Sequence, residues 1–166
     1  RTPTDELVLL GRANARNSNS VISVSTNEGK TWSELKELPY SLTGDRHKAE
    51  YDPVTKKVVV SFRLYLPEMK PNALSQINEL GGYWVAWVGS PEDLTDYALN
   101  SEKNKNSVLG DKMLVLGKTN DGKSDCGYAG VIIADGTVTM ASYGKFERGA
   151  KVPYILGVSF PVEKLG

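Results

Sequence analysis

The chain has 166 residues, of which 40% are hydrophobic and 24% charged, as is typical of one globular domain. Basic and acidic residues number 20 each, so the zero net charge excludes a broadly basic surface for nucleic acid. No apolar run approaches the roughly 20 residues that span a bilayer. One cysteine and one histidine exclude an intrachain disulfide and a multi-histidine metal site, and we expect no cofactor.

Short runs of β-branched and aromatic residues follow one another along the chain and predict an all-β fold. The runs expected to form strands are 6–11, 20–25, 48–52, 57–63, 82–89, 112–116, 130–134, 137–143 and 152–160. Asp135-Gly136 is the strongest signal for a two-residue hairpin turn. A short helical turn is expected at 92–99 and a long loop at 66–80.

About nine or ten strands joined by short turns indicate a sandwich, a barrel or the blades of a propeller. Propeller blades have four strands each, so a chain of this length would hold two to three antiparallel blades.

Residues 25–32 decide among these folds. They read S-T-N-E-G-K-T-W and resemble the Asp-box, S-x-D-x-G-x-T-W, the signature turn of sialidase-type β-propellers. The turn needs a side-chain acceptor at its third position, a glycine for a positive φ, and a tryptophan that folds back onto the blade core. Asn27 stands in place of the usual aspartate and keeps the acceptor oxygen, so we expect the hairpin to form.

The resemblance extends over nearly the whole chain. The segments that carry it are 37–39 (E-L-P), 44–47 (G-D-R-H), 125–128 (D-C-G-Y), 135–137 (D-G-T), 142–144 (S-Y-G) and 153–155 (P-Y-I). They are similar to the C-terminal half of bacterial sialidase-like proteins (exo-α-sialidases, or neuraminidases, with neuraminidase repeats). The resemblance implies a six-bladed propeller, of which residues 1–166 form the C-terminal half.

The family resemblance also implies a location and a partner. The chain begins at Arg1 and shows no signal peptide, so we expect a processed form or a fragment of a bacterial extracytoplasmic protein. Half a propeller leaves strand edges unpaired. We therefore expect self-association, or pairing with the missing N-terminal half.

The activity implied is that of a glycoside hydrolase acting on terminal acidic sugars of glycans. The carboxylate on the anomeric carbon of a sialic acid repels a carboxylate nucleophile, so sialidases use a tyrosine instead. Tyr128, seven residues before Asp135-Gly136, matches the family's nucleophile. The family's acid/base aspartate belongs to the first blades and is not expected in this chain.

Arginines bind the substrate carboxylate in this family, because guanidinium offers permanently charged, bidentate donors. Arg63 ends an apolar strand and matches one of them, and Arg46 and Arg12 are the other candidates. Asp45, Arg46 and His47 stand where the family has the glutamate that activates the tyrosine. His47 could replace it as a base or contact the substrate, because its ordinary pKa is near neutral.

Aromatic residues supply candidates for stacking on a sugar ring. Tyr143 is one, together with Tyr83, Trp84 and Trp87, although strand alternation places most of them in the core. Cys126 is expected to be a small buried thiol. No glutamate stands at positions 45–47, and Glu50, three residues after His47, would need a register shift to take its place. A non-catalytic carbohydrate-binding propeller, a glycosidase for a different sugar and an interaction module without a ligand therefore remain alternatives.

Overall fold

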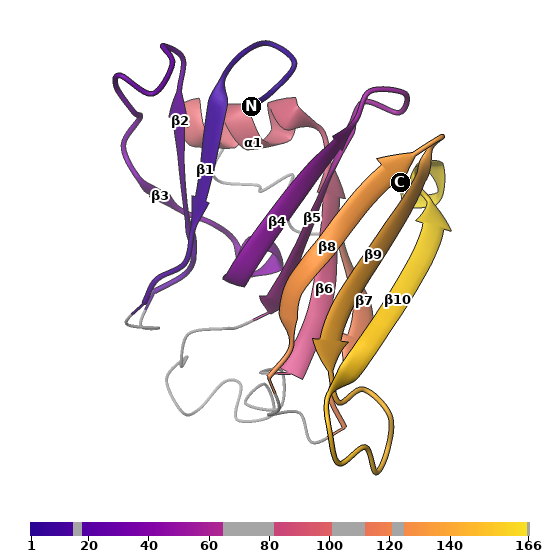
Figure 1. The fold of residues 1–166 in the computed structure, drawn as a ribbon. Helices are drawn as coiled ribbons and strands as arrows, with labels where there is room; N and C mark the ends of the chain where they lie inside the picture. The colour runs from indigo at the N-terminus through magenta and orange to yellow at the C-terminus, as the bar shows by residue number, and fades with distance from the viewer. Residues whose placement is uncertain (15–17, 65–81, 101–111, 121–124, 166) are drawn as a thin grey trace.

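The computed structural model describes residues 1–14, 18–64, 82–100, 112–120 and 125–165. These residues form three antiparallel sheets, and each sheet runs in chain order (Figure 1). The first sheet contains β1 (Leu7–Gly11), β2 (Val21–Ser25) and β3 (Lys36–Glu37). The second contains β4 (Gly44–Asp52), β5 (Lys57–Leu64), β6 (Tyr83–Gly89) and β7 (Met113–Lys118). The third contains β8 (Gly127–Ala134), β9 (Thr137–Gly144) and β10 (Tyr154–Pro161).

The all-β prediction is confirmed for the described residues, and every run predicted to form a strand overlaps one. The sheets have three, four and three strands in the described part of the chain, where four per blade were expected. The two-residue strand β3 was not predicted. The predicted loop at 66–80 lies outside the described residues.

The predicted helical turn is an α-helix, α1 (Pro91–Leu99), which packs against β2. Its N-terminus is capped reciprocally, because the Ser90 hydroxyl accepts from the Asp93 amide while the Asp93 carboxylate accepts from the Ser90 amide. No helix in the described residues is long and apolar enough to cross a membrane.

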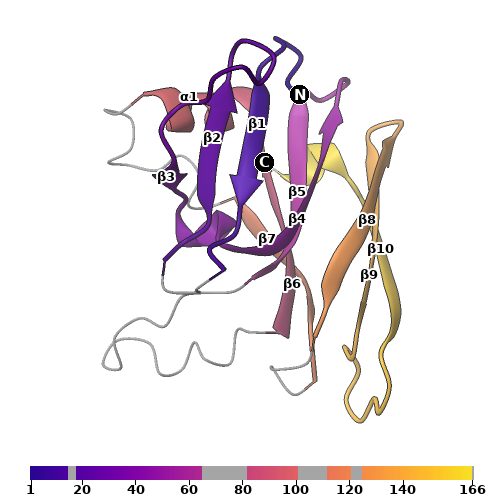
Figure 2. The ribbon, with the colours of Figure 1, turned by 60° about the vertical axis from the view of Figure 1, so that its left-hand side comes forward.

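The second sheet lies between the other two and is covered on both faces, as Figures 1 and 2 show from two directions. On β5, Val58, Val60 and Phe62 face the core shared with the first sheet and α1. Val59 and, on β6, Trp84 face the core shared with the third sheet. Double-sided burial explains why β5 and β6 read as continuous apolar runs rather than alternating ones.

The turns follow their sequence signals. Asp135 and Gly136 have φ values of 49° and 68°, which is the left-handed pair that a type I′ hairpin turn requires. They join Ala134 directly to its cross-strand partner Thr137. The prediction of a two-residue hairpin is therefore confirmed.

The Asp-box-like turn forms the hydrogen bonds expected of it. The Asn27 side-chain oxygen accepts from the Thr31 amide at 2.9 Å, and Gly29 has a φ of 78°. Trp32 differs from expectation. Its indole N–H donates to the Gly29 carbonyl at 3.1 Å, but the side chain remains 43% exposed over the turn and does not enter the core.

Candidate functional site

Several polar side chains come from neighbouring strand ends of the second and third sheets, and Figure 1 shows the course of these strands. Asp45 and Arg46 lie near the start of β4, and Arg63 lies near the end of the antiparallel strand β5. Asp125 precedes β8, and Tyr143 lies near the end of β9, which pairs with β8. Antiparallel pairing brings these strand ends together, and we call Asp45, Arg46, Arg63 and Asp125 the Arg–Asp cluster.

Arg63 and Asp45 form the buried base of this cluster. They are cross-strand partners, and the Arg63 Nε donates to Asp45 Oδ1 at 2.9 Å while Nη2 donates to Oδ2. Their side chains are only 11% and 4% exposed. Burial alone would lower the pKa of Arg63, but the hydrogen bonds and charge of Asp45 raise it. The Arg63 charge is therefore held in place and balanced by Asp45.

Asp125 links the second and third sheets. Its Oδ1 accepts from Arg46 Nη1 at 2.6 Å and from Arg63 Nη1, and its side chain is 52% exposed. Although burial raises the pKa of Asp125, hydrogen bonds from Arg46 and Tyr143 and the two arginine charges lower it below its ordinary value. Asp125 is thus an ionised carboxylate that is open to solvent.

The Tyr143 hydroxyl contacts one carboxylate and one guanidinium group of the Arg–Asp cluster. It donates to Asp125 Oδ2 and accepts from Arg46 Nη1 at 2.9 Å. Arg46 Nη1 also donates to the Cys126 carbonyl at 2.6 Å. Burial and the hydrogen bond to Asp125 raise the pKa of Tyr143, so its hydroxyl is neutral at pH 7.

Arg46 and Tyr128 meet through two strand irregularities. Register shifts occur between Asp45 and Lys48 and between Gly127 and Gly130, and Arg46 and Tyr128 have φ values of 62° and 49°. Such bulges redirect side chains out of the strand alternation. The Arg46 guanidinium carbon lies 4.3 Å from the centroid of the Tyr128 ring, and Tyr128 is 71% exposed. Together the two side chains form an exposed cation–π pair at the edge of the cluster.

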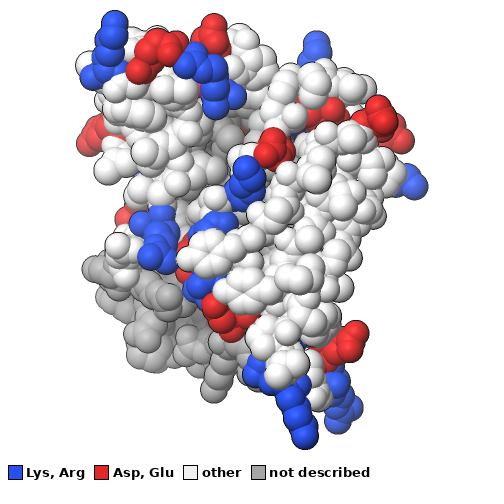
Figure 3. Space-filling view, viewed as in Figure 1, with Lys and Arg blue, Asp and Glu red and all other residues white. Residues whose placement is uncertain are grey.

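Arg12 supplies a third guanidinium. It follows β1 directly, and its Nη1 lies 3.9 Å from Asp45 Oδ2. Its side chain is 51% exposed, and its Nε donates to the Asn14 side chain at 2.8 Å. Three guanidinium groups therefore face two carboxylates, which leaves a local excess of positive charge. In Figure 3, charged atoms lie along a depression between the first and third sheets.

His47 lies apart from the cluster. Its ring stacks on Phe62 with centroids 4.9 Å apart, and its Nε2 donates to the Leu42 carbonyl at 3.0 Å. Both neighbours belong to the core between the first and second sheets. The structure thus brings six predicted site residues together at the Arg–Asp cluster, namely Arg12, Asp45, Arg46, Arg63, Tyr128 and Tyr143. His47 is directed into the core side of β4.

The burial of His47 predicts a pH-dependent stability. Burial lowers the pKa of His47, while its bond to Leu42 and the charge of Asp45 act in the opposite direction. Below the ordinary value of about 6.5, the unfolded chain binds a proton that the folded chain does not. We therefore expect the free energy of unfolding to fall between about pH 7 and pH 5. Urea unfolding across this range should show the slope, and His47→Gln should remove it; an NMR pKa at or above the ordinary value would contradict the expectation.

The other aromatic candidates for sugar stacking differ in burial. Trp84 and Trp87 are fully buried and belong to the two cores, which rules out their stacking on a sugar in this conformation. Tyr83 is half-buried, with the Lys118 ammonium 5.2 Å from its ring centroid. Cys126 is a buried thiol, as expected, and burial raises its pKa to about 11.

Sequence reasoning gave no role to Asp125, although it stands in the segment 125–128 that carries the resemblance. Its position directly before Cys126-Gly127-Tyr128, close to the predicted nucleophile, could have indicated that Asp125 belongs to the site. Among the described residues, no group of three or more potential ligands could hold a metal ion.

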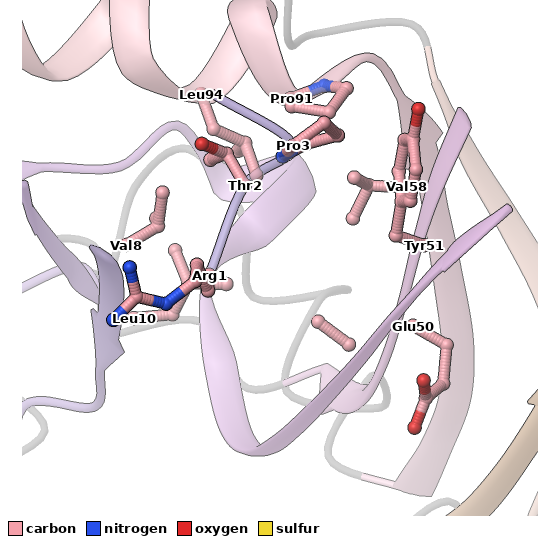
Figure 4. Close-up of a pocket in the computed structure, with 11 residues that line it drawn as sticks. Arg1, Thr2, Pro3, Val8, Leu10, Glu50, Tyr51, Val58, Pro91 and Leu94 are labelled. Atoms are coloured by element: carbon pink, nitrogen blue, oxygen red, sulfur yellow. The ribbon is translucent and has the colours of Figure 1, made fainter. Parts of the chain in front are cut away.

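A separate pocket lies on another part of the molecule, between β1, the β4–β5 hairpin and α1 (Figure 4). Its volume is about 310 Å³. The apolar part of its wall is formed by Pro3, Val8, Leu10, Ala49, Val58, Pro91 and Leu94. None of the predicted site residues lines it.

No family model and no curated protein matches this chain. Among solved structures, a crystal structure of a protein of unknown function from Dyadobacter fermentans DSM 18053 is similar to it. The match covers 96% of this chain with a TM-score of 0.57 and 18% sequence identity. This chain spans 35% of the length of that protein's chain. At this identity the likeness concerns the fold alone.

Proposed function

We propose that this chain is part of a sialidase-type, six-bladed β-propeller that binds and hydrolyses terminal acidic sugars of glycans. The observation that carries the proposal is the convergence of Arg12, Arg46 and Arg63 from three strands of two sheets. Guanidinium groups are the preferred partners of a carboxylate, and two tyrosine side chains border the same place. A sugar that carries a carboxylate suits this combination.

Two features support the propeller. Three consecutive antiparallel sheets, each running in chain order, have the arrangement of successive blades. The turn at 25–32 also has two features that the Asp-box motif requires, the side-chain acceptor at Asn27 and the positive φ of Gly29. In this proposal residues 1–166 are the C-terminal half of an extracytoplasmic protein.

The three arginines differ in how free they are to bind a ligand. Arg63 is held by Asp45, and Arg46 is held by Asp125 and the Cys126 carbonyl. Arg12 is half-exposed and lies 3.9 Å from its nearest carboxylate oxygen in Asp45. Arg12 can therefore bind a sugar carboxylate with the smallest loss of contacts within the protein. Arg46 is the second candidate.

A second candidate function is carbohydrate binding without turnover. The observation that favours it is the pairing of Arg46 and Arg63 with carboxylates of the protein itself. Paired in this way, the two arginines shape the site without contributing a free charge. This candidate shares the ligand and differs only in the absence of hydrolysis.

The test uses the full-length protein that contains this chain, with Arg12→Ala and Arg12→Lys variants. Affinity for sialosides should fall about tenfold to a hundredfold in Arg12→Ala, because a charge-assisted hydrogen bond is lost. Arg12→Lys should recover part of the loss. Arg148→Ala is the matched control, since Arg148 is exposed on the loop between β9 and β10.

Aryl sialosides and neutral aryl glycosides separate the outcomes. Turnover of the sialosides alone supports the hydrolase, and binding to sialosides without turnover supports the second candidate. If Arg12→Ala binds sialosides as tightly as Arg148→Ala does, or if neutral glycosides are bound equally well, the acidic-sugar site is wrong.

A further inference from the structure

The two tyrosines at the Arg–Asp cluster differ in what their hydroxyl groups contact. The Tyr128 ring covers the Arg46 guanidinium at 4.3 Å, and its hydroxyl has no hydrogen bond with any described residue. The Tyr143 hydroxyl donates to Asp125 and accepts from Arg46 at 2.9 Å. One tyrosine therefore presents a ring face, and the other presents a hydroxyl that already has a proton acceptor.

We infer that Tyr143 supplies the reactive hydroxyl of this site, that Asp125 accepts its proton, and that Tyr128 binds the sugar ring by stacking. This inference rests on the proposed hydrolase function. It exchanges the roles that the sequence resemblance assigns, since that resemblance makes Tyr128 the nucleophile.

The chemistry of the pair fits a tyrosine nucleophile. An attacking phenol must lose its proton as the new bond forms, so a proton acceptor within hydrogen-bond distance is required. Asp125 is ionised and bonded to the Tyr143 hydroxyl, whereas His47 is bonded to Leu42 in the core. Arg46 donates to the same hydroxyl and stabilises the negative charge that grows on its oxygen.

The first step balances with an aryl glycoside as substrate. Tyr143 Oη forms a bond to the anomeric carbon, and its proton passes to Asp125 Oδ2. The bond to the aryl oxygen breaks, and the electron pair leaves with the phenolate. In the second step a water molecule attacks the anomeric carbon, Asp125 returns its proton to the departing Tyr143 oxygen, and the proton of the water goes to solvent.

Tyr128 is placed for a different task. Its ring is 71% exposed, and it lies at the register shift between Gly127 and Gly130, where Gly127 and Tyr128 both have positive φ values. A Cβ on Gly127 would lie 3.0 Å from the Arg46 side chain, so the glycine permits the close approach of β8 to Arg46. The guanidinium behind the ring fixes its plane, and a fixed exposed ring is a platform for the apolar face of a sugar.

The decisive experiment traps the covalent intermediate on the full-length, unmutated protein. The probe is a sialosyl fluoride with a second fluorine beside the anomeric carbon, which slows hydrolysis of the glycosyl–enzyme bond. Intact mass should rise by one glycosyl group, and peptide mapping should place that group on Tyr143. An adduct on Tyr128 overturns the inference and leaves the hydrolase function standing. A protein that forms no adduct and turns over no sialoside overturns both.

Conservative variants give an independent readout. Tyr143→Phe should lower kcat by about three orders of magnitude or more while sialoside affinity changes less than about threefold, because only the reactive oxygen is removed. Arg148→Ala, on the exposed loop between β9 and β10, should keep kcat within about threefold, whereas Tyr128→Ala should raise KM about fivefold, because the stacking face is lost. If instead Tyr128→Phe loses kcat and Tyr143→Phe keeps it, the assignment is wrong.

Discussion

Replacing Arg63 with alanine is expected to lower the free energy of unfolding by about 3–5 kcal/mol. Asp45, with a side chain only 4% exposed, would lose the two hydrogen bonds that Arg63 supplies. Its remaining cationic contacts, to Arg12 at 3.9 Å and Arg46 at 4.0 Å, are longer. Removing the closest partner of a buried charge is among the largest effects that one substitution produces. Urea unfolding followed by tryptophan fluorescence measures the change.

A double-mutant cycle controls for lost packing. Asp45→Asn alone and Arg63→Ala alone should each be strongly destabilising, and the double variant should lose less than the sum of the two. Arg148→Ala, on an exposed loop, should stay within about 0.5 kcal/mol of the parent. Additive losses in the cycle would show that the two side chains do not depend on each other.

Replacing Trp84 with alanine should cost about 3–5 kcal/mol of unfolding free energy. Its side chain is fully buried between the second and third sheets, and its indole N–H donates to the Ser61 hydroxyl at 2.8 Å. The substitution leaves a cavity and also a buried hydroxyl without its donor. Urea unfolding again gives the free energy.

Trp32→Ala is the matched control for Trp84. Trp32 is 43% exposed, and its indole also donates one hydrogen bond, to the Gly29 carbonyl. Its replacement should cost about 1 kcal/mol, because it creates no buried cavity. Equal losses for the two variants would contradict the burial of Trp84.

Much of the fold could be predicted because its signals are local. Asp135-Gly136 specifies its own turn, Ser90 and Asp93 specify the start of α1, and the apolar runs of β5 and β6 mark strands covered on both faces. Strand β3 escaped prediction because two residues carry no pattern. The position of Trp32 was wrong, because the motif fixes the indole bond to Gly29 but not the depth of the ring.

The site was harder to predict than the fold because its partners are far apart in sequence. Arg63 and Asp45 share one hairpin, but their pairing depends on the register shift between Asp45 and Lys48. Arg46 and Asp125 are 79 positions apart, one in β4 and the other before β8. Arg46 and His47 are neighbours in sequence, and the register shift of β4 falls on them, so the regular alternation of the strand could not show which of the two faces the cluster. No pattern along the chain specifies which residue a bulge turns outward.

The single cysteine gives this molecule a built-in chemical reporter. Cys126 is fully buried, burial raises its pKa to about 11, and its carbonyl oxygen holds Arg46. A thiol reagent needs both access and a thiolate, so it reacts only when the core between the second and third sheets opens around Cys126. The rate of labelling in the unmodified chain therefore counts opening events at the Arg–Asp cluster, and a bound sugar that bridges the two sheets would slow it.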